Sequence, residues 1–162
     1  MISGRVGVLQ SALYVAVACA LAAALLSRLL VLSEAAEKAA MEATLGRVQG
    51  ALYVKLAQAA LTGAQGAAQD WTERNPFVLA EAVPANYAGE LHAPDLRELA
   101  RGQWYYDTVR REVVYLLRQS RAFAGDGSEP PNLRFRLEVE RGPGGGYRRV
   151  TLRSLTSYVW EP

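Results

Sequence analysis

Hydrophobic residues are continuous near the start of the chain and become periodic further along. Residues 6–27 carry no charge and lie between Arg5 and Arg28. At about 1.5 Å of rise per residue, an uncharged helix of this length spans roughly 30 Å of hydrocarbon. Because apolar residues continue past Arg28, the pattern predicts a membrane-spanning half of a helix over residues 6–32, after a short tail over residues 1–5.

The same helical pattern continues without a proline over residues 33–62, where the apolar residues narrow to a stripe. Spacings of three and four place them on one face of a helix, so we expect this amphipathic half to pack against the rest of the chain. The stripe residues are Met41, Leu45, Val48, Leu52 and Leu56. Gly46 and Gly50 each cost about 1 kcal/mol relative to alanine in a helix interior, which predicts a soft point there.

The remaining residues, 63–162, begin as a connector punctuated by prolines and continue as segments with a period of two. Segments 103–108, 112–118, 133–139 and 147–155 are predicted to be four antiparallel strands with one apolar face. The predicted core residues of the sheet are Trp104, Leu133, Phe135, Leu137 and Val139. The amphipathic half of the helix is the element of matching length. The predicted fold class is therefore α+β, with the long helix packed on a four-stranded antiparallel sheet.

Charge and composition exclude one class of partner and suggest an orientation. Of the 18 basic residues, Arg5 and Arg28 flank the apolar segment, so the other 16 balance the 16 acidic residues. A nucleic-acid footprint needs a clustered basic excess, so no nucleic-acid partner is expected. The positive charges beside the short tail favour an N-terminus in the cytoplasm and a domain outside it.

The sequence offers no constellation for catalysis or for a metal. His92 is the single histidine, so we expect no zinc site, and no serine has a histidine partner for nucleophilic catalysis. Asp126 and Glu129 share one loop but fall short of the about six to eight oxygen ligands that calcium takes. We therefore expect a non-enzymatic protein with no cofactor, no metal and no small-molecule substrate.

Two other interpretations of the apolar segment are open. A cleaved signal peptide would use a small-residue site at residues 16–18 or 22–24, although apolarity over residues 6–32 is long for such a peptide. A lipoprotein signal would use Cys19, for which the plainer interpretation is a small buried thiol in a membrane helix. A permanent membrane helix remains the expectation.

Small residues recur every four positions within the apolar segment. Ala12, Ala16, Ala20 and Ala24 form one ridge of the helix, and Gln10 is the strongly polar side chain near its start. Ridges of small residues let helices approach closely in lipid, where packing drives association. The ridge predicts a partner helix in the membrane, and chance spacing in an alanine-rich segment is the alternative interpretation.

Several segments carry a resemblance to a known family. They are residues 36–63 (AEKAAMEATLGRVQGALYVKLAQAALTG), 75–77 (NPF), 84–91 (PANYAGEL), 102–117 (GQWYYDTVRREVVYLL) and 157–160 (SYVW). Together with the long half-apolar helix, they make the chain resemble the type IV pilins and the type II secretion pseudopilins. The resemblance implies a structural subunit of an envelope-spanning filament, or of the complex that assembles it.

The start of the chain departs from the pattern of that family. Its members usually carry a glycine after which a membrane peptidase cuts, and a glutamate as the fifth residue after the cut. The resemblance places the cut between Gly4 and Arg5, so that the fifth residue is Leu9 and the sixth is the neutral Gln10. Three interpretations follow: a minor subunit that needs no such charge, a pilin-like protein kept in the membrane, or a different start codon.

The resemblance also implies partners and a location. The partners are other pilin or pseudopilin subunits, proteins of the secretion or pilus machinery, and membrane lipid. The location is the bacterial inner membrane, crossed once, with the N-terminus in the cytoplasm and the C-terminal domain in the periplasm or in an extracellular filament. The alternative is a membrane-anchored periplasmic binding or regulatory module with the same fold that does not polymerise.

Overall fold

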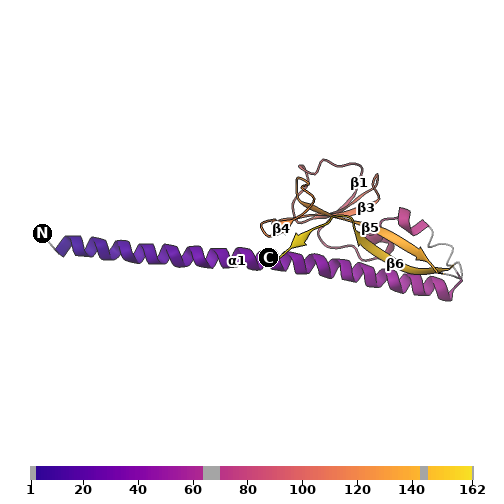
Figure 1. The fold of residues 1–162 in the computed structure, drawn as a ribbon, viewed down its shortest axis with the longest axis horizontal. Helices are drawn as coiled ribbons and strands as arrows, with labels where there is room; N and C mark the ends of the chain where they lie inside the picture. The colour runs from indigo at the N-terminus through magenta and orange to yellow at the C-terminus, as the bar shows by residue number, and fades with distance from the viewer. Residues whose placement is uncertain (1–2, 64–69, 143–145, 162) are drawn as a thin grey trace.

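The computed structural model describes residues 3–63, 70–142 and 146–161, with the backbone alone for residues 3–10. One helix dominates it: α1 (Ser3–Leu61) has 59 residues, about 88 Å at 1.5 Å per residue. Figure 1 shows its first half projecting away from the domain and its second half lying along a sheet. The α+β class and the long N-terminal helix are confirmed.

Helix α1 runs unbroken through its two interior glycines. Nothing lies within 4 Å of the position where a side chain would begin at Gly46 or Gly50, so both face open space. The soft point predicted there does not interrupt the helix. Gly63 follows the helix with a φ of 71°, the left-handed conformation that closes helical C-termini.

Five strands form the main sheet, in the order β1-β2-β3-β5-β6. They are β1 (Tyr87–Leu91), β2 (Trp104–Asp107), β3 (Glu112–Leu116), β5 (Asn132–Arg141) and β6 (Tyr147–Ser154). Strand β1 runs parallel to β2, whereas the pairs β2–β3, β3–β5 and β5–β6 are antiparallel. The prediction of a four-stranded antiparallel sheet is therefore wrong, because the sheet is mixed and has a fifth strand.

The additional strand β1 comes from the proline-punctuated connector. Gly89 lies at its middle with a φ of 116°, and the register of its pairing with β2 shifts there. Backbone hydrogen bonds extend the pairing at both ends, from Trp104 to the Asn86 carbonyl at 3.0 Å and from Thr108 to the Leu91 carbonyl at 2.9 Å. A short strand with alanine and glycine inside carries little signal in a hydrophobicity pattern, which explains the error.

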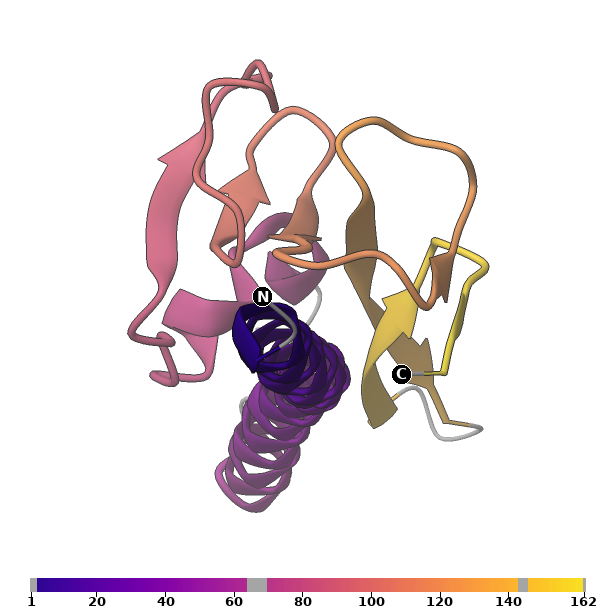
Figure 2. The same cartoon turned by 90° about the vertical axis from the view of Figure 1, so that its left-hand side faces the viewer.

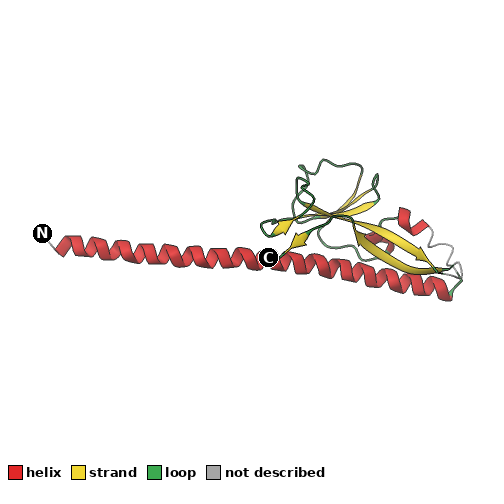
Figure 3. Cartoon of the chain, in the orientation of Figure 1, coloured by secondary structure: helices red, strands yellow, loops and turns green. Residues whose placement is uncertain are grey.

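Short elements complete the fold, and Figure 3 shows them by type. Strands β4 (Phe123–Ala124) and β7 (Val159–Trp160) form a separate two-stranded sheet. Helix α2 (Pro76–Leu79) begins after Asn75, whose side-chain oxygen accepts the Phe77 N–H at 3.0 Å. This hydrogen bond satisfies one of the donors that a helix N-terminus leaves free.

The core lies between the sheet and the second half of α1. The residues predicted for the helix–sheet core all lie in this cluster, and each is at most 6% exposed except Leu45 and Val139, which are partly buried against it. The others are Met41, Val48, Leu52, Leu56, Trp104, Leu133, Phe135 and Leu137. The Trp104 ring has its centroid 4.7 Å from that of Tyr115 and 5.5 Å from that of Phe77.

The first half of α1 has no such partner in the domain. Every side chain from Ser11 to Leu29 is exposed, including leucines such as Leu13, at 62%, and Leu21, at 66%. By length and composition this helix could cross a membrane. An apolar surface of this extent is unfavourable in water, so it is consistent with a transmembrane helix.

Candidate functional site

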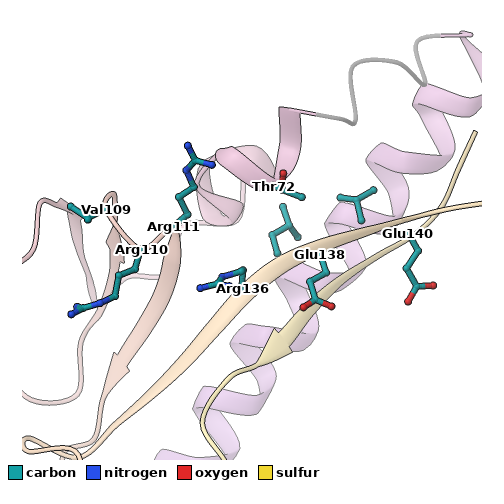
Figure 4. A pocket seen from close by; sticks show the side chains of 9 residues that line it. Thr72, Val109, Arg110, Arg111, Arg136, Glu138 and Glu140 are labelled. Atoms are coloured by element: carbon teal, nitrogen blue, oxygen red, sulfur yellow. The ribbon is translucent and has the colours of Figure 1, made fainter.

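An open hollow of about 670 Å³ lies beside the sheet, and its charged residues are paired. Figure 4 shows its side chains, most of which come from β5 and from the turn between β2 and β3. Arg110 lies 3.2 Å from a carboxylate oxygen of Asp107, and Arg136 lies 2.6 Å from one of Glu112. The residues that line the hollow include no histidine, cysteine or serine.

His92 and Asp126, which were considered for a metal, are engaged in other contacts. In the described part of the chain, no three His, Cys, Asp or Glu residues gather to hold a metal ion. The exposed His92 has its Nδ1 3.3 Å from the Thr108 hydroxyl. Asp126 accepts the Ser128 N–H at 3.1 Å and pairs with Arg134 at 3.0 Å. The hydrogen bonds from Ser128, and then Arg134, lower the pKa of this carboxyl.

Polar side chains concentrate where α1 first meets the domain. We define the helix–domain junction as Ser33, Glu34, Glu37, Lys38, Tyr115, residues 118–122 and Trp160. Glu34 is 3% exposed, and its Oε1 accepts the Ala122 N–H at 3.0 Å and the Trp160 Nε1–H at 3.1 Å. A buried carboxylate is tolerated only with such donors. Glu34 thereby holds both the loop after β3 and the strand β7 on the helix.

Glu37 binds the same loop one turn further along α1. Its Oε1 accepts the Tyr115 hydroxyl at 2.9 Å and the Arg118 N–H at 2.6 Å, and its Oε2 accepts the Gln119 N–H at 3.1 Å. Burial, and then the Glu37 charge, raises the pKa of Tyr115, so the phenol remains a donor. Gln119 also donates from Nε2 to the Ser33 hydroxyl at 2.7 Å.

The C-terminal strand β7 closes the junction. The Lys38 Nζ donates to the Trp160 carbonyl at 2.6 Å, and the Glu161 N–H donates to the Ala122 carbonyl at 3.2 Å. The rings of Phe123 and Trp160 pack edge to face with their centroids 6.0 Å apart. Figure 2, which looks along α1 from its N-terminal end, shows the loops and β7 beside the helix. Segments distant in sequence therefore meet on two turns of α1.

Another polar helix residue covers the outer edge of the sheet. Gln49 donates from Nε2 to the Val150 carbonyl at 2.6 Å and accepts the Leu152 N–H at its Oε1 at 2.8 Å. A neighbouring strand would form the same kind of bonds with the backbone of β6. Gln49 therefore blocks part of an edge that would otherwise be a template for pairing with another chain.

The residues predicted for the membrane lie on the projecting half of α1. The exposed ridge residues are Ala12, Ala16, Ala20 and Ala24. Gly4, Arg5 and Gln10 lie outside the residues whose side chains the structure describes. Cleavage after Gly4, and a polar contact of Gln10 with a partner, therefore stay predictions.

The sequence does not indicate that three polar residues of α1 form hydrogen bonds with the domain. They are Glu34, Glu37 and Gln49, which sequence patterning treats as polar positions. One signal was present for Glu34, which lies seven residues, or about two turns, before Met41. A carboxylate on the same face as an apolar stripe indicates a buried partner, whereas nothing local identifies the partner as the loop after β3.

Comparison of the chain with protein-family models, curated proteins and solved structures gave no match. The pilin-like relation therefore stays a prediction. Two structural features of the chain bear on its function. One is an apolar half-helix that the domain does not cover, and the other is a junction whose hydrogen bonds fix the domain at one end of that half.

Proposed function

We propose that this chain is a membrane-anchored structural subunit that acts by assembly, in a filament of the type IV pilin or type II secretion pseudopilin kind. The observation that carries the proposal is the division of α1: side chains from Ser11 to Leu29 are exposed, whereas the second half packs on the sheet. A helix this apolar is stable in lipid and against other helices. The projecting half is thus exposed to neighbouring subunits.

The chemistry of the described residues favours a structural role over an enzymatic one. Charged residues of the hollow beside the sheet form ion pairs with residues next to it, and those of the junction hold the fold together. The projecting half offers its alanine ridge, along which another helix can approach closely. The proposed partners are pilin or pseudopilin subunits and assembly proteins. The proposed location is the inner membrane, with the N-terminus in the cytoplasm.

Disulfide cross-linking in native membranes tests the assembly proposal. Ala16→Cys and Ala18→Cys, each combined with Cys19→Ser, place a single cysteine at nearly the same depth on faces of the helix that lie about 200° apart. We expect mild oxidation to link the Ala16 variant to a second copy or a partner subunit at least about fivefold more efficiently. Equal yields would contradict the ridge, and no cross-link at either position would contradict assembly through the span.

A second candidate function is an anchored binding or regulatory module that does not polymerise. One observation favours it: a cut after Gly4 leaves Leu9, and not a glutamate, as the fifth residue. The intact mass and the N-terminal sequence of the protein from native membranes separate the two functions. A chain that begins at Arg5 with an added methyl group supports the filament. An uncut chain that begins at Met1 supports the anchored module.

A further inference from the structure

The arginines of the domain differ in their pairing. One group forms ion pairs with carboxylates and consists of Arg110, Arg111, Arg134, Arg136, Arg149 and Arg153. Within the described residues, Arg97, Arg101, Arg118 and Arg121 form no ion pair, and all four are exposed. A guanidinium without a carboxylate presents five donors to whatever lies next to it.

These four arginines lie in two loops, one of which belongs to the helix–domain junction. Arg118 and Arg121 belong to the loop that Glu34 and Glu37 hold on α1. Arg118 also lies against Gly102, because a Cβ there would meet its Nε at 2.8 Å. This contact places the loop that contains Arg101 beside the loop after β3.

A hollow joins the two loops. Arg97, Arg101 and Ser120 line it together with Glu129, and its volume is about 480 Å³. Figure 2 looks at this end of the domain, where the loops between β1 and β2 and after β3 lie around and above the projecting helix. Arg97, Arg101, Arg118 and Arg121 therefore occupy the end of the domain that faces the apolar half of α1.

Carboxylates in the region do not balance these cations. The carboxylates of Glu34 and Glu37 are oriented toward the junction, where they accept hydrogen bonds from backbone and side-chain donors. Exposed carboxylates near these arginines that form no ion pair in the described residues are Asp95, Glu98, Glu129 and Glu161, whose N–H is bonded to the Ala122 carbonyl. The four arginines together with Arg28 make five exposed cations against these four exposed carboxylates, an excess of one positive charge.

Helix geometry sets the height of this cluster above the membrane. Glu34 lies six residues, or about 9 Å of helix, beyond Arg28 at the end of the uncharged segment, and two residues, or about 3 Å, beyond Leu32 at the end of the apolar half. The headgroup layer on each side of the hydrocarbon core is about 5–8 Å thick. The loop of residues 118–122, which is hydrogen-bonded to Ser33 and Glu34, therefore lies at the level of the lipid phosphates or just above it.

We propose that Arg97, Arg101, Arg118 and Arg121 bind the phosphates of anionic phospholipid headgroups in the leaflet from which α1 emerges. The inference rests on the membrane anchoring in the proposed function and adds a second, electrostatic contact between the domain and the bilayer. Arginine forks bind phosphate oxygens in pairs, and each basic residue near an anionic surface is attracted to it. The contact fixes the rotation of the domain about α1 relative to the membrane surface.

A depth measurement on the full chain tests this binding. The protein with Ser120→Cys and Cys19→Ser carries a fluorophore at residue 120 and is reconstituted into vesicles that contain a headgroup spin-labelled phosphatidylcholine as quencher. One set of vesicles is phosphatidylcholine alone, and the other also contains phosphatidylglycerol. We expect quenching to rise at least about twofold in the anionic vesicles, and about 0.5 M salt to remove the rise.

Paired variants isolate the arginines. Arg101→Gln with Arg121→Gln should abolish most of the rise in quenching. The matched control, Arg74→Gln with Arg148→Gln, removes the same charge from two exposed arginines that form no ion pair in the described residues. They precede α2 and begin β6, elements that Figure 1 places toward the C-terminal end of α1, so this control should keep the rise. An unchanged near-ultraviolet circular dichroism spectrum verifies that each variant is folded.

The outcomes separate this inference from the proposed anchoring. Flotation with both kinds of vesicle reports the anchor, and a protein that floats with neither contradicts the proposed function itself. A protein that floats with both but shows equal quenching in the two overturns the lipid contact. The same holds if Arg101→Gln with Arg121→Gln leaves the rise intact, an outcome that would assign the arginines to an acidic protein partner.

Discussion

The two halves of α1 carry similar apolar residues in opposite surroundings. Leu25, in the first half, is 63% exposed, whereas Leu52, in the second half, is fully buried against the sheet. No break in the helix separates the halves. The boundary is marked by polar residues from Ser33 to Lys38, which hydrogen-bond to the domain. The comparison teaches that polar contacts, and not helix length, determine where the domain begins.

The largest effect should come from one leucine-to-alanine change made in each half. Leu52→Ala leaves a cavity in the core and should lower the free energy of unfolding by about 2–5 kcal/mol. Leu25→Ala removes the same atoms from a residue outside the core and should change it by less than about 0.5 kcal/mol. Urea unfolding of the full chain in detergent, followed by tryptophan fluorescence, measures both. A comparable loss at Leu25 would mean that the halves are not independent.

A smaller effect should follow at the boundary itself. Glu34→Ala leaves the partly buried N–H of Ala122 and the buried indole N–H of Trp160 without an acceptor and should cost about 2–4 kcal/mol of unfolding free energy. Glu34→Gln keeps an acceptor oxygen and should lose clearly less. Urea unfolding gives the energies, and the indole N–H resonance of Trp160 reports the bond directly. Equal losses in the two variants would show that the hydrogen bonds are not what holds the boundary.

The smallest effect should come from the polar residue within the buried half. Gln49→Ala removes two hydrogen bonds to the edge of β6 and should cost about 1–2 kcal/mol. Hydrogen exchange at the Leu152 amide should accelerate more than exchange elsewhere in β6. Gln58→Ala, at an exposed position of the same helix, is the matched control and should leave that amide unchanged. Equal acceleration by both variants would argue against edge protection by Gln49.

Regular periodicity made much of the fold predictable. The stripe from Met41 to Leu56 and the alternation in β5 each report one buried face, and the structure places both in one core. Strand β1 was not predicted, because Gly89 interrupts its alternating pattern and because its partner β2 runs parallel to it. The two-residue strands β4 and β7 are too short to carry a period. These strands form because tertiary contacts stabilise them, although their local sequence pattern does not indicate a strand.

The junction was less predictable, for a physical reason. Glu37 reads in sequence as a solvent-facing charge beside Lys38, yet its carboxylate accepts hydrogen bonds from residues nearly eighty positions away. Tyr115 and Arg118 lie 78 and 81 residues from it. Hydrophobic periodicity reports which face of an element is buried but not which backbone N–H groups need an acceptor. Such contacts become visible only when the loop after β3 has been placed in space.

Because α1 is unbroken, a change in the tilt of its anchored half also moves its second half and the domain packed on it. From Leu32 to Leu61 the helix extends about 45 Å beyond its apolar half. A change of about 10° in the tilt of the anchored half, which is within the range of transmembrane helices, would sweep the far end of the domain sideways by about 8 Å. Small rearrangements among helices in the bilayer would thus move the β5–β6 hairpin by about the length of a side chain.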